Sequence, residues 1–395
     1  MNVLARTLSV HNYRSFKEFD VELDPDITIL IGRNAVGKTN LIESVQLLTA
    51  GQSFRRPTAS QLARNGEGTC RIDLSFTGEG RRVEHALVCS EGKKSFFSNG
   101  KRTSAAGMRG LVPSILFCPD HLDMIKRAAS HRRAALDDFG IQLNDRYAHL
   151  VSSYARVVEQ RNSLLKEYPV PTDLLGAWDE ALVQTGAALL SHRLSLLERI
   201  RLRMVDAYRA IAPTEALGLS YQSTVGEIDI STSRAEIEEL FRGALGRAAE
   251  DERRRGITVV GPHRDEISFS IDGREARDFA SQGQQRSLVL AWKIAEAEVA
   301  SDILGRYPML LLDDVMSELD PSRRRQLIER IDRVQTFVTC TDLSDLAGAR
   351  QGAVYRVENG VLTVANERLF ETGQGIQVFV DTDGESLFLD YDTEY

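Results

Sequence analysis

The chain has few cysteines, and none of them lies at a spacing that suits a metal ion. The four cysteines (Cys70, Cys89, Cys118 and Cys340) are far apart among 395 residues, and no Cys-x-x-Cys pair occurs. A zinc site or a disulfide framework is therefore not expected. Sparse, unpaired cysteines are typical of a reducing compartment, so we expect a cytoplasmic location.

Long apolar runs are also absent. No stretch approaches the roughly 20 apolar residues that a membrane-spanning helix needs. The first residues, Met1–Arg6, lack the basic start and apolar stretch of a signal peptide. The sequence thus predicts no association with a membrane, and its length allows a large core divided between two structural units.

An excess of positive charge is the third missing feature. The chain carries 49 Lys and Arg against 57 Asp and Glu, which gives a formal net charge of -8. Proteins that coat nucleic acid without sequence preference are usually basic. Any contact with nucleic acid must therefore come from a local cluster of basic side chains.

Hydrophobic patterning divides the chain into strand-rich ends and a helical middle, where apolar residues recur at helical spacing. The predicted strands are 8–11, 19–23, 27–31, 71–76, 83–88, 309–312 and 336–340, followed by a hairpin that joins 354–357 to 361–364 through Asn359-Gly360. We predict four parts: the N-terminal part of an α/β unit at 1–128, a helical insertion at 129–255, the C-terminal part of the α/β unit at 256–368, and an acidic tail at 369–395.

A glycine-rich loop follows the third predicted strand. Residues 32–39, Gly-Arg-Asn-Ala-Val-Gly-Lys-Thr, fit the pattern G-x-x-x-x-G-K-[ST] and precede an apolar helix. Glycine lets backbone N–H groups curl toward phosphate oxygens, and the helix start adds partial positive charge. Lys38 is predicted to bind the β- and γ-phosphates of ATP, and Thr39 to bind Mg²⁺. The predicted ATP-binding residues are Arg14, Gly32, Arg33, Asn34, Ala35, Val36, Gly37, Lys38, Thr39 and Asn40.

Two adjacent carboxylates end a buried apolar strand at 308–312. An Asp at the end of a strand beside a phosphate-binding loop holds Mg²⁺, and we assign this role to Asp313. Asp314 is predicted to face the γ-phosphate, where it orients or deprotonates the attacking water. The predicted catalytic residues are therefore Lys38, Asp313 and Asp314, with Thr39 and Asp313 as metal ligands.

A third motif, Ser281-Gln282-Gly283-Gln284-Gln285, precedes an Ala-rich helix. It resembles the signature motif of ABC ATPases, whose Ser hydroxyl, Gly backbone and helix N-terminus complete the γ-phosphate site of the opposite subunit. The alternative is an ordinary helix cap. The resemblance implies an ATP-dependent head-to-tail homodimer, with Ser281, Gly283, Gln284 and Gln285 as contacts in trans and Ser317 and Asp320 in the D-loop. We predict an α/β fold, an ABC-type ATPase head (a P-loop NTPase with a mixed sheet) that carries an inserted helical subdomain.

Further motifs resemble the RecF family of bacterial recombination mediators, which are related to SMC proteins. They lie at 8–16, 132–137, 160–166, 261–265 and 311–320, and the resemblance covers about residues 4–364. It implies an ATP-driven dimer that clamps double-stranded DNA near single-strand gaps. It also implies a role in DNA repair after damage, the SOS response and replication restart, where the dimer helps to load recombinase with RecR and RecO-type partners.

Three groups typical of transporter ATPases are missing or altered. Segment 112–117 has no Q-loop glutamine, Thr339-Cys340-Thr341 has no switch histidine, and the second acid is Asp314 rather than Glu. These departures leave the attacking water less well positioned, so we expect slow hydrolysis. We also expect the hydrolysis to depend on Mg²⁺ and to be stimulated by DNA. The ATPase subunit of a membrane transporter remains the main alternative. An SMC protein would need far longer heptad segments, and a small-molecule kinase would have no use for the Ser281–Gln285 element.

Other features allow more than one interpretation. The sequence does not select which basic cluster contacts DNA phosphates among 55–56, 81–82, 93–94, 101–102, 132–133, 253–255 and 323–325. His263 and Arg264 belong either near the nucleotide or dimer interface, or to a structural turn. The acidic tail is either a solvated end or a segment that anchors a partner through Phe388 and Tyr391.

Overall fold

The computed structural model describes residues 3–78, 80–169, 171–331, 334–346, 348–349, 352–365, 367–372, 375–382 and 385–390. The chain forms two compact units, one from Met1–Asp120 and Ala300–Tyr395 and the other from His121–Val299. Residues 256–299 thus pack with the second unit, whereas we predicted them in the C-terminal part of the α/β unit. The four-part domain assignment stays a prediction, because compactness alone does not define a functional domain.

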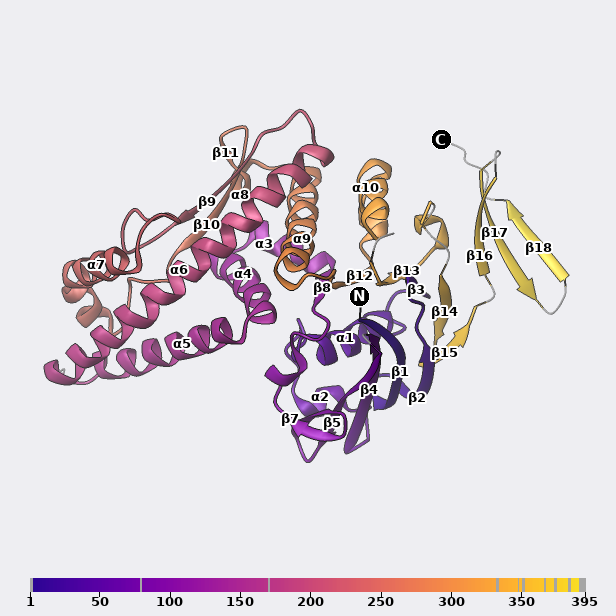
Figure 1. Ribbon diagram of the computed structural model, residues 1–395, viewed down its shortest axis with the longest axis horizontal. Coiled ribbons are helices and arrows are strands. Elements are labelled where there is room, and N and C mark those ends of the chain that lie inside the picture. Colours follow the sequence, from indigo (N-terminus) through magenta and orange to yellow (C-terminus); the bar gives the residue numbers. More distant parts are fainter. Residues whose placement is uncertain are drawn as a thin grey trace. The chain divides into compact units, whose positions relative to one another are not determined.

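The first unit contains a six-stranded sheet in the order β15-β14-β3-β13-β12-β8 (Figure 1). Five of its strands are parallel: β3 (Ile27–Ile31), β8 (Ser114–Phe117), β12 (Met309–Asp313), β13 (Thr336–Cys340) and β14 (Ala353–Glu358). Every residue of β3, β12 and β13 is buried, as expected for strands covered on both faces. The carboxyl ends of these three neighbouring strands meet at one edge of the sheet.

The predicted hairpin forms one edge of this sheet. The last strand, β15 (Val361–Val364), pairs antiparallel with β14. Asn359 and Gly360, at the turn, have φ of 48° and 75°. A two-residue turn with positive φ at both positions matches the twist of the strands that it joins. The hairpin prediction is therefore confirmed, and so are the seven predicted strands.

A second sheet in this unit is antiparallel, in the order β2-β1-β4-β5-β6-β7. Its strands are β1 (Leu4–Tyr13), β2 (Phe16–Glu22), β4 (Thr69–Gly78), β5 (Arg81–Ser90), β6 (Lys93–Ser98) and β7 (Lys101–Thr103). One face of this sheet shares a hydrophobic core with helix α1 (Lys38–Thr49) and the parallel sheet. Ten of the twelve residues of α1 are buried, because the helix lies between two sheets. The helix that begins at the glycine-rich loop is therefore buried along most of its length.

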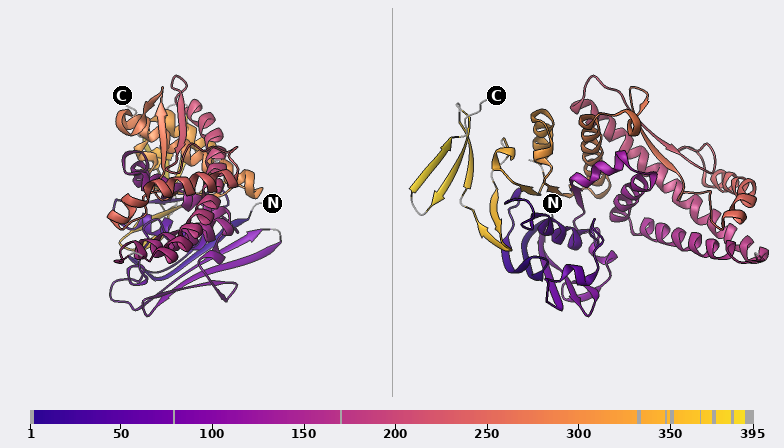
Figure 2. Two further views of the ribbon diagram at one scale, coloured as in Figure 1. Left: turned by 90° about the vertical axis from the view of Figure 1, so that its left-hand side faces the viewer. Right: turned by 180° about the vertical axis from the view of Figure 1, so that it is seen from behind.

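The second unit is mainly helical. Its longer helices are α4 (Ala129–Leu143), α5 (Asp145–Leu165), α6 (Thr172–Ile211), α7 (Arg234–Arg255) and α9 (Gln282–Leu304), the last of which ends in the first unit. Helices α5 and α6 form a hairpin and run side by side (Figure 1 and Figure 2). Tyr154, Leu182 and Phe241 belong to the core that α5, α6 and α7 share. The predicted helical character of residues 130–255 is confirmed for most of this segment.

One strand within the helical segment was not predicted. Strand β9 (Leu217–Gln222) pairs antiparallel with β10 (Glu266–Ile271), which also pairs with β11 (Arg274–Glu275). The remaining short elements are α2 (Ala59–Leu62), α3 (Asp123–Lys126), α8 (Ala276–Phe279), η1 (Ala106–Met108), η2 (Pro119–Leu122), η3 (Met316–Glu318) and η4 (Leu343–Leu346), and the first unit also contains α10 (Pro321–Ile331). The described helices include none with the length and apolar character required to cross a membrane.

The segment predicted as an acidic tail contains three antiparallel strands. These are β16 (Glu367–Thr372), β17 (Gly375–Thr382) and β18 (Glu385–Asp390), with β17 in the centre. The sequence analysis assigned no secondary structure here. The suggested anchors, the side chains of Phe388 and Tyr391, lie outside the described part of the chain.

Candidate nucleotide site

The glycine-rich loop connects β3 to α1 through a backbone that most side chains would disturb. Gly37, the residue before the helix, has φ of 113°. A Cβ atom at Gly37 would lie 2.7 Å from Ser15 Oγ and 3.0 Å from the ring of Phe16. A Cβ at Gly32 would lie 2.5 Å from a backbone carbonyl oxygen of β14. Both glycines of the motif are therefore required by contacts within the first unit.

Lys38 is held by the loop that it belongs to. Its side chain is 3% exposed, and Nζ donates hydrogen bonds to the carbonyl oxygens of Gly32 at 2.7 Å and Arg33 at 3.2 Å. The same Nζ lies 3.6 Å from Asp314 Oδ1. The Lys38 ammonium is thus held beside the loop by contacts within the protein itself, and the N–H groups of this loop suit phosphate oxygens.

Asp313 stands at the end of β12, and its carboxylate faces the first turn of α1. Thr39 Oγ1 donates to Asp313 Oδ1 over 2.9 Å, and the residue is 5% exposed. Burial raises the pKa of Asp313 above its ordinary value, hydrogen bonds from Thr39 and Thr339 oppose this shift, and the charge of Asp314 adds to it. This hydroxyl and carboxylate suit Mg²⁺, which prefers oxygen ligands and takes only one or two from the protein when it binds a nucleotide.

The described residues contain no group of three or more His, Cys, Asp or Glu side chains that could hold a metal by themselves. A metal at Thr39 and Asp313 would therefore rely on phosphate and water oxygens for its remaining ligands, as Mg²⁺ does in phosphoryl-transfer sites. The Thr39 hydroxyl and the Asp313 carboxylate therefore fit the metal of Mg-ATP. Asp314, the residue after Asp313, has a different partner. Its Oδ1 lies 3.6 Å from Lys38 Nζ.

Arg14, predicted to bind ATP, is engaged by a buried carboxylate that sequence reasoning missed. Its Nη2 lies 2.8 Å from Glu43 Oε2, and its Nη1 donates to the carbonyl of Gln61 at 2.8 Å. Glu43 lies on α1 and is fully buried, and it also accepts hydrogen bonds from Tyr13 OH at 3.1 Å and Ser53 Oγ at 2.6 Å. The contact of Arg14 with ATP stays a prediction, whereas its contact with the phosphate-loop helix is structural.

Asn40 and Arg55 complete the surroundings of this helix. Arg55 Nη1 donates to Asn40 Oδ1 at 3.0 Å and lies 4.0 Å from a carboxylate oxygen of Glu43. Burial raises the pKa of Asp313, and the positive charge of Arg55 weakly opposes this rise. The basic pair at 55–56 was noted in the sequence only as a possible DNA contact. The structure places Arg55 beside the phosphate-loop helix.

The signature-like motif lies in the second unit, at the start of α9. Ser281 Oγ accepts a hydrogen bond from the backbone N–H of Gln284 at 3.2 Å, and Gln284 Oε1 accepts one from Ser281 N–H at 2.9 Å. This reciprocal pair is a capping box. Gln284 also donates to Glu215 at 3.1 Å, and Gln285 to the carbonyl of Ala280 at 2.8 Å. Gly283 lies in the first turn of the helix. The action of these residues in trans stays a prediction.

The D-loop residues stabilise the turn after β12. Ser317 Oγ donates to the carbonyl oxygen of Asp314 at 3.2 Å. Asp320 accepts hydrogen bonds from the backbone N–H groups of Ser322 and Arg323 at 3.0 and 3.1 Å and forms an ion pair with the Arg323 side chain. Asp320 thus caps α10, which follows it directly.

The Gly-Pro-His-Arg-Asp segment forms a buried turn in the second unit. Asp265 is fully buried and accepts four hydrogen bonds, from Tyr221, from Ser223 and from the backbone and side chain of Thr224. His263 lies between the Tyr154 hydroxyl at 2.8 Å and the carbonyl of Thr258 at 3.1 Å. Of the two roles left open by the sequence, these contacts favour the structural turn.

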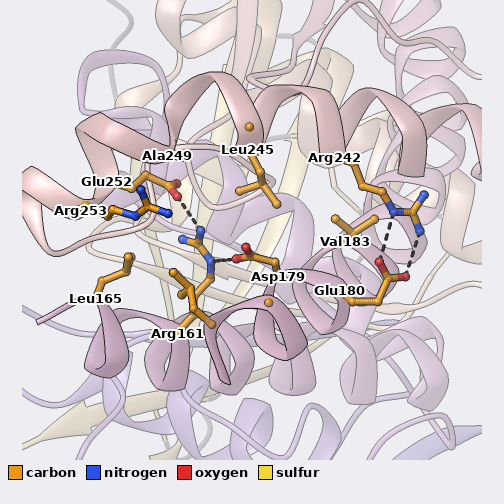
Figure 3. Close-up of a pocket in the computed structure, with 13 residues that line it drawn as sticks. Arg161, Leu165, Asp179, Glu180, Val183, Arg242, Leu245, Ala249, Glu252 and Arg253 are labelled. Carbon is orange, nitrogen blue, oxygen red and sulfur yellow. Dashed lines mark hydrogen bonds and ion pairs between the residues drawn. The ribbon is translucent and has the colours of Figure 1, made fainter. Parts of the chain in front are cut away.

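The helical-lobe motifs supply buried arginines that bind carboxylates. Arg132 Nε lies 2.8 Å from Glu266 Oε1, and Arg161 Nη2 lies 2.6 Å from Glu252 Oε2. Arg161 also lines a cavity of about 340 Å³ between α5, α6 and α7 (Figure 3). Figure 3 shows its ion pair with Asp179 beside the Glu252 contact. None of the predicted nucleotide-binding residues lines this cavity, whereas Arg253 of the basic cluster 253–255 does.

Comparison with known proteins supports the resemblance seen in the motifs. The sequence model described as "RecF/RecN/SMC N terminal domain" matches residues 4–363. The chain is 37% identical over 374 residues to the DNA replication and repair protein RecF of Symbiobacterium thermophilum, covering 92% of this chain and 99% of that one. It is 38% identical over 370 residues to the RecF protein of Pelotomaculum thermopropionicum, covering 91% and 100%.

Solved structures agree. The structure titled "recombination mediator protein RecF-ATPrS in RecFOR pathway" superposes with a TM-score of 0.85 at 28% identity, covering 92% of this chain and 98% of that one. An SMC head domain from Pyrococcus furiosus gives a TM-score of 0.55 at 14% identity, covering 92% and 96%, and so shares the fold alone. With its ABC-type α/β head and its match along nearly the whole length of RecF proteins, the chain belongs to the RecF family of the RecF/RecN/SMC proteins.

Proposed function

We propose that this protein is an ATP-dependent DNA-binding protein of recombinational repair and replication restart, located in the cytoplasm. Two copies close around two ATP molecules, clamp double-stranded DNA near single-strand gaps and help to load recombinase. Slow, Mg²⁺-dependent and DNA-stimulated hydrolysis releases the clamp. RecR and RecO-type mediators are the proposed partners, because a structural relative is titled as a member of the RecFOR pathway.

The observation that carries the proposal is the convergence of four side chains at one sheet edge. Lys38 and Thr39 begin α1. Lys38 lies 3.6 Å from Asp314, which follows β12, and Thr39 lies 2.9 Å from Asp313, which ends β12. Such a group binds the terminal phosphates and metal of a nucleoside triphosphate. Ser281 and Gly283 begin a helix, whose first N–H groups suit an anion.

Hydrolysis is expected to be slow for a structural reason. Thr339 and Cys340 at the end of β13 are buried, and no histidine follows them where a transporter ATPase has one. Asp314 is the remaining candidate base, one methylene shorter than Glu. The transporter alternative has no support among the reported relatives, which are named as DNA replication and repair proteins.

The outer face of β6 and β7 is the candidate DNA surface. Lys93 and Arg102 are exposed, and Phe97 is the register partner of Arg102. Side chains alternate along a strand, so Lys93 and Phe97 lie on the face opposite the buried Phe96. Exposed cations around an aromatic ring suit phosphates and bases. We define Lys93, Phe97 and Arg102 as the basic face.

Other basic clusters are more strongly engaged within the protein. Arg132 is buried against Glu266, and Arg254 and Arg255 pair with Asp251. Arg324 lies 3.2 Å from Asp345. The basic face is therefore the cluster we favour for DNA contacts.

The test uses the Asp314→Asn protein, in which we expect ATP to bind but not to turn over. Light scattering after size exclusion should give a dimer with Mg-ATP and a monomer without it, and DNA affinity should rise under the dimer condition. A protein that stays monomeric with ATP, or dimerises without binding DNA, would refute the clamp.

The basic face is tested with Lys93→Ala/Arg102→Ala, and Arg254→Ala/Arg255→Ala is the matched control. Loss of two phosphate contacts should lower the slope of log affinity against log salt by about 2. The control should keep the wild-type slope. The reverse pattern would move the DNA surface to the end of α7.

A further inference from the structure

One buried hydroxyl contacts both acids at the end of β12, Asp313 and Asp314. Thr339, on the neighbouring strand β13, is the register partner of Asp313 and is fully buried. Its Oγ1 lies 3.0 Å from Asp313 Oδ1 and 2.8 Å from the backbone nitrogen of Asp314. No motif of the sequence analysis assigned a role to this threonine.

The chemistry of the three groups fixes the direction of each hydrogen bond. A backbone N–H can only donate, so the Thr339 oxygen accepts from Asp314. The single hydroxyl proton then goes to the Asp313 carboxylate. Asp313 Oδ1 also accepts from Thr39 at 2.9 Å, so two hydroxyls from different elements hold one carboxylate oxygen.

The same contact holds an unfavourable backbone conformation. Asp314 has φ of 50°, which costs free energy for residues other than glycine unless the surroundings stabilise it. The bond from its N–H to Thr339 does so. In this conformation the Asp314 carboxylate reaches Lys38 while the Asp313 carboxylate faces Thr39. Two adjacent acids therefore serve two different partners.

We propose that Thr339 is a positioning residue that holds Asp313 for Mg²⁺ and Asp314 for the attacking water through one hydroxyl group. The inference rests on the proposed Mg-ATP function of this site. Its chemistry is that of a group that orients a metal ligand and the catalytic acid next to it, where a substitution costs about 10–100-fold in metal affinity or activity.

Three substitutions isolate the hydroxyl. Thr339→Val removes it at nearly constant volume, and Thr339→Ser restores it. Thr336→Val is the matched control, because Thr336 lies on the same strand, is also fully buried, and bonds to the carbonyl of Val334 at 3.1 Å rather than to an acid.

Turnover and metal affinity are measured separately. Mn²⁺ binding in the presence of ATP, followed by electron paramagnetic resonance, reports the metal site without hydrolysis. Thr339→Val should weaken Mn²⁺ binding and lower kcat by about 10–100-fold each, with KM for ATP nearly unchanged. Thr339→Ser should restore both, and Thr336→Val should match the wild type.

Three results would overturn the inference: wild-type metal affinity and turnover in Thr339→Val, an equal loss in Thr339→Ser, or the same loss in Thr336→Val. The proposed function fails in a different way, through a wild-type chain that hydrolyses no ATP. Mn²⁺ binding with ATP would then still compare Thr339→Val with Thr339→Ser. A wild-type chain that binds no nucleotide would overturn both proposals.

Discussion

Replacing Glu43 by Gln removes the charge at the centre of the phosphate-loop helix and should destabilise the first unit. Glu43 is fully buried, while its partner Arg14 keeps 20% of its side chain exposed. The Arg14 guanidinium reaches both carboxylate oxygens, at 2.8 and 3.0 Å. A glutamine offers only one acceptor oxygen there, and its amide nitrogen would face an Arg14 donor.

The size of the effect follows from these contacts. Breaking a buried ion pair costs about 3–5 kcal/mol, and the partial exposure of Arg14 places this case at the lower end. The Ser53 hydroxyl, which donates to Glu43, can rotate and accept a hydrogen bond from the new glutamine amide, so the contact with Ser53 is kept. We expect a loss of about 3 kcal/mol, which corresponds to a fall in Tm of about 6–12 °C for a unit of this size.

Differential scanning calorimetry without nucleotide measures this loss, since bound ATP would mask it by mass action. Glu18→Gln, an exposed position on β2, is the control and should stay within about 0.5 kcal/mol of the wild type. The Arg14→Met/Glu43→Gln double variant should lose less than the sum of the single losses. A Glu43→Gln loss below about 1 kcal/mol, or strict additivity, would refute this account of the helix.

Two further predictions concern a histidine and a glycine. Burial lowers the pKa of His263 to about 4, below the value near 6.5 of the unfolded chain. The unfolded state therefore binds more protons between these values, and the stability gained at neutral pH, on the order of 3 kcal/mol, should be lost as pH falls from about 6.5 to 4. Urea unfolding at several pH values checks this, and His263→Gln should flatten the dependence; an unchanged slope would contradict it. Gly37→Ala places a methyl group against Ser15 and should abolish ATP binding in calorimetric titration, whereas Gly66→Ala, at a similarly positive φ with open space around it, should bind ATP normally.

The parts predicted well from sequence are those encoded locally. The glycine-rich loop, its flanking strand and helix, and the two acids at the end of β12 are contiguous patterns whose chemistry depends on neighbours in the chain. The Asn359-Gly360 hairpin was predictable for the same reason. In each case a short segment contains both the conformation and its cause.

The parts that were missed depend on distant partners. Glu43 stands among apolar residues of α1, where a charge suggests an exposed position. Its partners are Tyr13 at the end of β1, Arg14 just after that strand, and Ser53 in the loop after α1. Strand β9 alternates apolar residues (Leu217, Leu219 and Tyr221) with small or polar ones, but the run is only six residues long and contains a glycine. Its partner β10 follows only after α7. His263 and Arg264 had two possible roles in the sequence, and only the contacts with Tyr154 and Thr258 favour the structural turn.

Arg161 has a consequence for the internal motions of the second unit. Its three guanidinium nitrogens bind Asp179 on α6, Glu252 on α7 and Thr258 beyond α7, at 2.6, 2.6 and 2.9 Å. If any one of these elements moves away, the charge of Arg161 loses a partner and becomes exposed, although the other two elements still contact it. The amides near these contacts should therefore exchange with deuterium as one cooperative group rather than element by element.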